Sequence, residues 1–115
     1  MVVRSVHDKH GSPTYTADLA RGIEQLLDTD EYGAYHMSNQ GGCSRVEYVR
    51  QIIRCFGLPT AVEEVDSSHY PRKANVPNCE VLYDFNARFI RISDLPPWEE
   101  AIERYIRTLR VEMGT

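Results

Sequence analysis

Residues 44–59 read SRVEYVRQIIRCFGLP, and this stretch carries the signals of a complete helix. Ser44 and Glu47 form a capping box, in which each side chain satisfies a free backbone N–H at the helix start. The apolar residues recur at helical spacing and predict one buried face: Val46, Val49, Ile52, Ile53 and Phe56. Gly57 is suited to end the helix in a left-handed conformation, and Pro59 prevents the helix from resuming.

The segment before this helix predicts a strand and an earlier helix. Residues 2–6 are rich in valine and are followed by a polar turn, as expected of a short strand. Thr16 can cap a helix that runs to about Leu27, with Asp18 favourably placed in its first turn. Four apolar residues fall at helical spacing and predict one apolar face for this helix: Leu19, Ile23, Leu26 and Leu27.

Shorter elements complete the predicted order. Residues 33–38 indicate a second short strand and residues 61–65 a third, whereas residues 66–78 are expected to lack regular structure. Residues 81–83 predict a brief strand or turn. A last helix is expected to have Pro97 at its first position. The order β-α-β-α-β-α predicts a small mixed α/β fold with some parallel strand pairing.

The composition is that of an ordinary folded domain. The 115 residues carry a net charge of −4, and 42% of them are hydrophobic. A negative chain is a poor nucleic-acid binder, because neutralising phosphates needs clustered Lys and Arg. No run of about eighteen apolar residues occurs, so we expect no membrane span. No charged-then-apolar leader opens the sequence. Cys43, Cys55 and Cys79 are odd in number, widely spaced and free of any Cys-x-x-Cys pair, so we expect reduced thiols in a cytoplasmic protein.

The motifs give little support to catalysis by this chain. The dinucleotide motif Gly-x-Gly-x-x-Gly is absent, and no spacing of histidines and cysteines favours a metal site. Short-chain reductases use a tyrosine as proton donor, with a lysine four positions later that lowers its pKa. None of the seven tyrosines in this chain has a lysine at that position. The glycine turn at residues 39–44 could hold an anion, or it is a plain capped turn. Cys43, at the same helix start, is either activated there or simply buried.

Several segments, taken together, resemble one known family. They are residues 11–20 (GSPTYTADLA), residues 33–39 (GAYHMSN), residues 42–44 (GCS), Pro77 with Val81 and Leu82, and residues 95–101 (LPPWEEA). In this order they resemble the C-terminal part of dTDP-4-dehydrorhamnose reductase, an extended short-chain reductase. The resemblance implies that residues 1–115 form a single partial domain, the substrate-binding C-terminal lobe, which lacks the Rossmann cofactor domain.

The resemblance also implies a function. The family uses NADPH to reduce the 4-keto group of dTDP-4-dehydro-L-rhamnose to dTDP-L-rhamnose, a precursor of cell-surface polysaccharide. Its cofactor site and its catalytic tyrosine and lysine belong to the Rossmann domain, so we expect this chain to hold no cofactor and to be inactive alone. The predicted substrate-binding residues are Ser12, Thr14, Tyr15, His36, Asn39, Arg72 and Trp98. For each of them the alternative is a structural role in a turn, a hydrogen bond or packing.

Three positions depart from the family's pattern. Val76 stands where the family usually has arginine, Glu80 where it usually has serine, and Arg45 where an aromatic residue is common. The lost arginine removes a bidentate phosphate contact, and the glutamate adds negative charge near an anionic ligand. Either the ligand differs, or Arg72 compensates, or the sequence is a decayed or partial copy.

The expected partners follow from the missing Rossmann domain. We expect a dTDP-linked deoxysugar as ligand, and the Rossmann domain or a complete reductase as protein partner. The faces toward that partner should be apolar and exposed, so we also expect a homo-oligomer. The alternative is a truncated, non-catalytic family member that acts as an assembly or regulatory subunit of a complete reductase.

Overall fold

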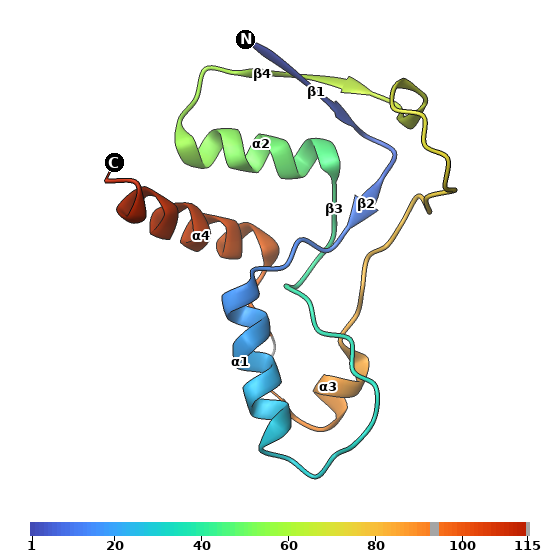
Figure 1. Cartoon of the computed structure of the whole chain (residues 1–115), viewed down its shortest axis with the longest axis vertical. Helices are drawn as coiled ribbons and strands as arrows, with labels where there is room; N and C mark the ends of the chain where they lie inside the picture. The colour runs from blue at the N-terminus through green and yellow to red at the C-terminus, as the bar shows by residue number, and fades with distance from the viewer. Residues whose placement is uncertain (93–94, 115) are drawn as a thin grey trace.

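The computed structural model describes residues 1–92 and 95–114 and confirms a mixed α/β fold (Figure 1). Strands β1 (Val2–Val6) and β4 (Ala61–Val65) pair in parallel, with Val2 opposite Ala61 and Val6 opposite Val65. The valines of both strands suit a pleated, half-buried surface. Helix α2 (Arg45–Phe56) packs against this two-stranded sheet. The expected parallel pairing is therefore present.

Helix α2 begins and ends where its local sequence predicts. The Ser44 hydroxyl accepts the N–H of Glu47 at 3.1 Å, and the Glu47 carboxylate accepts the N–H of Ser44 at 3.1 Å. Gly57 follows the helix with a φ of 66°, which a residue with a side chain rarely adopts. Both ends of the helix are therefore determined by neighbouring residues alone.

Helix α4 (Trp98–Glu112) supplies most of the hydrophobic core. Trp98, Ile102 and Ile106 are buried together with Cys43, which lies just before α2. Four partly buried residues of α2 cover this cluster: Tyr48, Ile52, Cys55 and Phe56. The helix begins one residue later than predicted, because Pro97 is its N-cap and not its first residue.

The prediction of a strand at residues 33–38 is wrong. These residues form no strand, and the antiparallel pair nearby is made instead by β2 (His10–Gly11) and β3 (Cys43–Ser44). Ser38 and Asn39 are buried, but through side-chain hydrogen bonds to Asp84 and Asp18. Polar side chains therefore hold this extended segment, and a strand ladder is not needed. Residues 81–83 likewise form no strand.

Helix α1 (Thr16–Leu27) has the predicted span but not the predicted cap. Tyr15 occupies the N-cap position, and no side chain caps the helix. The buried residues of this helix are Asp18 and Gly22. Two members of the predicted apolar face, Ile23 and Leu27, are exposed. Helix α1 therefore does not bury its apolar face within the described part of the chain.

Two short helical segments lie outside the predicted elements: the 3-10 turn η1 (Ser67–His69) and helix α3 (Phe85–Phe89). Each is too short for a helical period to show in the sequence. Helix α3 leaves Phe85 and Phe89 exposed, and their rings stack with centroids 6.5 Å apart. None of the helices in the described residues has the length and apolar character needed to cross a membrane.

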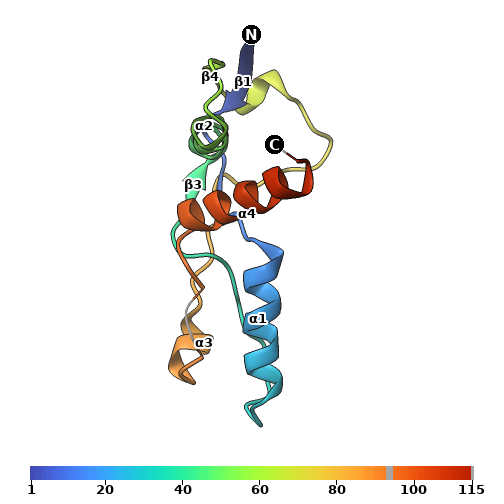
Figure 2. The same ribbon diagram turned by 90° about the vertical axis from the view of Figure 1, so that its left-hand side faces the viewer.

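The molecule is flat and open (Figure 2). Its principal extents are 51 × 40 × 20 Å, and its radius of gyration is 16.5 Å, against about 13 Å for a compact domain of this length. The accessible surface of 8096 Å² also exceeds the roughly 6400 Å² of a compact monomer of this mass. Helices α1 and α3 extend away from the body made by α2, α4 and the parallel sheet (Figure 1). Both helices carry exposed apolar side chains, namely Ile23 and Leu27 on α1 and Phe85 and Phe89 on α3.

A buried carboxylate joins α1 to α4. Asp18 is 2% exposed, and it accepts hydrogen bonds from Arg104 at 2.9 and 2.5 Å and from Asn39 at 2.8 Å. Arg21, on α1 itself, also donates to this carboxylate. The Arg104 Nε also donates to the Glu100 carboxylate at 2.6 Å. Because α1 buries little else, this polar junction is a main attachment of the helix.

The two glycines before α2 allow other side chains to pack closely against the backbone of the turn. Gly41 has a φ of 79°, and a Cβ there would lie 3.4 Å from the Trp98 ring. A Cβ on Gly42 would lie only 2.4 Å from a methyl group of Val81. Since real contacts are not that short, the segment around Val81 can approach the turn only because residue 42 is glycine.

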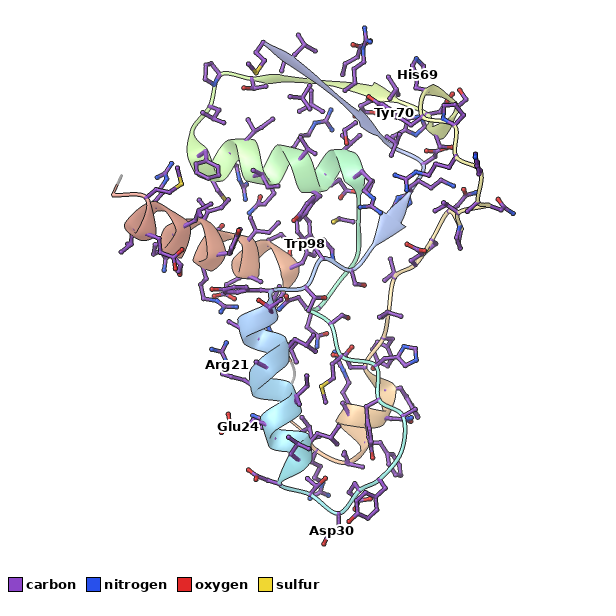
Figure 3. The ribbon with its side chains drawn as sticks, in the orientation of Figure 1. Arg21, Glu24, Asp30, His69, Tyr70 and Trp98 are labelled. Atoms are coloured by element: carbon purple, nitrogen blue, oxygen red, sulfur yellow. The ribbon has the colours of Figure 1, made fainter. Side chains whose placement is uncertain are left out.

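We expect Asp18→Asn to lower the free energy of unfolding by about 1–3 kcal/mol, because Arg104 loses its buried partner and keeps only the exposed Glu100. Urea unfolding followed by circular dichroism measures the change. Glu24→Gln, on the exposed side of the same helix (Figure 3), is the matched control and should change stability by less than about 0.5 kcal/mol. Equal effects of the two substitutions would contradict the role of the junction.

The same carboxylate makes stability depend on pH. Burial opposes the charged form of Asp18, but the hydrogen bonds from Arg104 and Asn39 outweigh it and lower the pKa of this carboxyl. A depressed pKa contributes stability above the unfolded value of about 3.9, and this contribution is lost as the pH falls through the folded pKa. The wild-type protein should therefore lose more stability on acidification below about pH 5 than Asp18→Asn. Parallel pH profiles would refute this.

Gly42→Ala should destabilise the protein by about 1–3 kcal/mol, because the new methyl group overlaps Val81. Val81 is 40% exposed, so Val81→Ala alone should cost less. The double variant should recover most of the loss, since the overlap is gone. A double-mutant cycle in urea measures this coupling, and purely additive effects would exclude the packing explanation.

Candidate functional site

A hollow of about 330 Å³ lies where α1, α2 and α4 approach one another, and we name it the aromatic hollow. Its lining residues are Pro13, Thr14, Tyr15, Thr16, Asn39, Tyr48, Trp98, Ala101, Ile102 and Tyr105. Four of the seven predicted substrate-binding residues are in this set: Thr14, Tyr15, Asn39 and Trp98. They come from three separate segments of the sequence, which the fold brings together.

Asn39 is the buried organiser of the aromatic hollow. Its amide oxygen accepts the N–H of Tyr15 at 2.7 Å, and its amide nitrogen donates to Asp18 at 2.8 Å and to the Pro96 carbonyl at 3.0 Å. Asn39 is 1% exposed. One side chain therefore ties the start of α1 to the start of α4. Its hydrogen-bonding groups are largely used inside the protein, so it positions other residues of the hollow.

Aromatic side chains form the walls of this hollow. Tyr15 meets Tyr105 edge to face, with ring centroids 5.5 Å apart, and the Arg104 guanidinium lies 5.5 Å from the Tyr15 ring centroid. Trp98 is fixed by its backbone N–H, which donates to the Gln40 carbonyl at 3.0 Å (Figure 3). Flat aromatic faces and few free polar groups suit the stacking of a planar or sugar ring.

Tyr48 and Tyr105 also line the aromatic hollow, although the sequence alone does not predict them as site residues. Tyr48 lies on the first turn of α2, and Tyr105 lies two turns after Trp98 on α4. The only signal available was helical spacing, which marks Tyr105 as part of an apolar face and equally suits a core residue. Their convergence with Tyr15 depends on how three helices pack.

A second hollow, of about 320 Å³, adjoins the first, and we name it the central hollow. Pro13 and Tyr48 line both. Ser12 and Glu80 both line the central hollow, and the Ser12 hydroxyl accepts the N–H of Leu82 at 2.9 Å. The Thr14 hydroxyl donates to the Ser12 carbonyl at 3.0 Å. The turn before α1 is therefore internally braced.

The two remaining predicted residues lie elsewhere. Arg72 lines a third hollow, of about 380 Å³, beside the sheet, and we name it the basic hollow. Arg45 lines both the basic and the central hollow. His36 is exposed on the segment between α1 and β3 and lines none of the three hollows. The fold therefore does not bring His36 to the other six residues.

Cys43 lies at a helix start but does not have the environment of a reactive thiol. It is 3% exposed, and burial, with Glu47 and Glu99 nearby, raises the pKa of its thiol to about 11. The thiolate, which is the nucleophilic form, is therefore disfavoured at neutral pH. Among residues 1–92 and 95–114, no group of three or more His, Cys, Asp and Glu side chains could hold a metal ion.

Known proteins are similar to this chain in sequence. The spore coat polysaccharide biosynthesis protein SpsK of Bacillus subtilis is 37% identical over 107 residues, which are 91% of this chain and 36% of that protein. The dTDP-4-dehydrorhamnose reductase of Mycolicibacterium smegmatis is 34% identical over 85% of this chain and 31% of its own length. The chain thus spans about a third of the length of these curated relatives.

Crystal structures of two dTDP-4-dehydrorhamnose reductases match the fold. The enzyme from Bacillus anthracis, solved in complex with NADP, superposes with a TM-score of 0.87 at 33% identity, over 93% of this chain and 37% of that one. The Clostridium acetobutylicum protein gives a TM-score of 0.91 at 30% identity, over 95% of this chain and 39% of that one. The resemblance found in the sequence motifs is therefore confirmed.

One family model matches almost the entire sequence. Residues 1–111 match the family model of the RmlD substrate binding domain. The match includes all seven predicted substrate-binding residues and all three hollows. The chain belongs to the RmlD substrate binding domain family.

Proposed function

We propose that this chain is the substrate-binding C-terminal portion of a dTDP-4-dehydrorhamnose reductase. In the complete enzyme the reaction would be the NADPH-dependent reduction of dTDP-4-dehydro-L-rhamnose to dTDP-L-rhamnose. Residues 1–115 would be one partial domain, and a Rossmann domain or a complete reductase would be its partner. The chain would work in the cytoplasm and self-associate through its exposed apolar faces.

The observation that carries this proposal is the convergence of Thr14, Tyr15, Asn39 and Trp98 on one hollow. The aromatic rings of the hollow would enclose one ring of the nucleotide-sugar. Asn39 and its partner Asp18 would keep the Tyr15 backbone in place. Ser12 and Arg72 would contact the ligand from the adjoining hollows. The contribution to catalysis is then orientation of the substrate and closure over it.

The glycine turn does not suit the pyrophosphate of a dinucleotide. In a dinucleotide fingerprint, glycine leaves room for the ligand to approach the backbone. Here the space beside Gly42 holds the Val81 side chain, and the space beside Gly41 holds Trp98. The N–H of Ser44 and that of Glu47 are already paired in the capping box. NADPH, which supplies the hydride of the family reaction, would therefore bind to the partner domain.

Binding of dTDP-rhamnose should change the fluorescence of Trp98, which is the single tryptophan of the chain and lines the aromatic hollow. Tyr15→Ala removes one wall of the hollow and should weaken binding by about tenfold or more. Tyr32→Ala is the matched control, because Tyr32 is 90% exposed and lies outside the hollow. Equal affinities of the two variants, or no binding by the wild type, would contradict the proposal.

The isolated chain should not oxidise NADPH in the presence of dTDP-4-dehydrorhamnose, because the proposal assigns hydride and proton transfer to the partner domain. A spectrophotometric assay of NADPH consumption measures this, with a full-length dTDP-4-dehydrorhamnose reductase as positive control. Sustained turnover by the purified 115-residue chain would refute the assignment.

A further inference from the structure

The basic hollow lies beside the carboxyl ends of two parallel strands. Residues 4–6 of β1 line it, Lys9 and Ser67 lie just beyond the ends of β1 and β4, and residues 70–72 and 74–76 form a rim. Tyr70 belongs to this rim and lies beside the end of β4 (Figure 3). Ligands of open α/β sheets commonly bind at the carboxyl ends of parallel strands.

The hollow concentrates positive charge that the protein leaves uncompensated. Four cations line it: Arg4, Lys9, Arg45 and Arg72. Arg4 is paired with Glu63 at 3.0 Å. Among the described residues, the other three form no ion pair with a carboxylate, although the chain as a whole carries a net charge of −4. Like charges that share a hollow repel one another, so a bound anion would relieve this repulsion.

Lys9 is held in place by neutral acceptors. Its Nζ donates to the Val76 carbonyl at 2.8 Å and to the Asn78 side-chain oxygen at 2.8 Å. An ammonium group has three N–H donors, so a third remains for a ligand. Asp8, the carboxylate next to Lys9 in the sequence, instead accepts the N–H and the hydroxyl of Ser67 at 3.2 and 2.8 Å. The charge of Lys9 is thus fixed in position but not neutralised.

We propose that the basic hollow binds a diphosphate group, and that Lys9, Arg45 and Arg72 are its ligands. This inference rests on the proposed function, which supplies the diphosphate as part of a nucleotide-sugar. Arg45 connects the basic hollow to the central hollow, and Pro13 and Tyr48 connect the central hollow to the aromatic one. An extended ligand would lay its diphosphate at the basic end and a ring at the aromatic end. Lys9 reaches the backbone of Val76 and so brings a positive charge to that position.

Titration with inorganic pyrophosphate by calorimetry tests the hollow without the rest of the nucleotide-sugar. Wild-type protein should bind pyrophosphate more tightly than inorganic phosphate, and rising salt should weaken the binding. Arg72→Gln and Lys9→Met should each weaken it by about tenfold, as the loss of a charged hydrogen bond predicts. Lys73→Met is the matched control, because Lys73 neighbours Arg72, is exposed and does not line the hollow. Equal loss in Lys73→Met, or equal affinity for phosphate and pyrophosphate, would overturn the inference.

The unmodified protein offers a second measurement that does not depend on how the variants fold. The chain contains two lysines, Lys9 and Lys73. Pyrophosphate should slow the reaction of Lys9 with an amine-reactive reagent, whereas Lys73 should react at an unchanged rate, as peptide mass spectrometry can quantify. Protection of neither lysine, or of both equally, would contradict the proposal.

The two proposals fail in different ways. If dTDP-rhamnose changes Trp98 fluorescence with the same affinity in wild type and Lys9→Met, while Tyr15→Ala still weakens its binding, the diphosphate site is wrong and the proposed function stands. If pyrophosphate protects Lys9 but dTDP-rhamnose does not compete with it, the anion site is supported and the proposed function is wrong. Competition between the two ligands supports both.

Discussion

The ion pair between Asp18 and Arg104 is the constraint on which the arrangement of this chain depends. Helix α1 buries no large apolar side chain, so hydrophobic packing alone cannot fix its direction. The carboxylate has side-chain exposure of 0% and is held by residues from α4 and from the segment before β3. A buried ion pair is stabilising only with good geometry and further hydrogen bonds, and here both are present. The junction therefore tolerates few arrangements of the three segments.

The same junction determines the shape of the aromatic hollow. Asn39 donates to Asp18 and accepts from the Tyr15 backbone, so any shift of α1 displaces one wall of the hollow. Arg104 lies over the Tyr15 ring while its guanidinium holds Asp18. Stability and the shape of the hollow therefore depend on one set of contacts. This explains why Asn39 and Asp18 are among the most buried side chains of the chain although both are polar.

The sequence predicts best those features that are determined by residues close together in the chain. The ends of α2 are determined by Ser44, Glu47 and Gly57, which act on their own backbone, and the capping pattern predicts them correctly. Residues 33–38 look like a strand, yet their long-range hydrogen bonds are made with side chains far away in the sequence: Ser38 donates to Asp84, and the Ala34 carbonyl accepts from Asn86. Thr14, Tyr15, Asn39 and Trp98 could be named from motif resemblance. The positions of Tyr48 and Lys9 beside the hollows could not be predicted, because they depend on contacts with segments far away in the sequence.

Glu80 limits how a charged ligand could lie across the three hollows. It is exposed and lines the central hollow, between the cations of the basic hollow and the rings of the aromatic hollow. A carboxylate there repels phosphate groups, whereas it can accept hydrogen bonds from hydroxyl groups. A diphosphate would therefore be driven toward Lys9 and Arg72, and the uncharged parts of the ligand would occupy the space beside Glu80. Attraction at one end and repulsion in the middle would together give the ligand a single direction along the hollows.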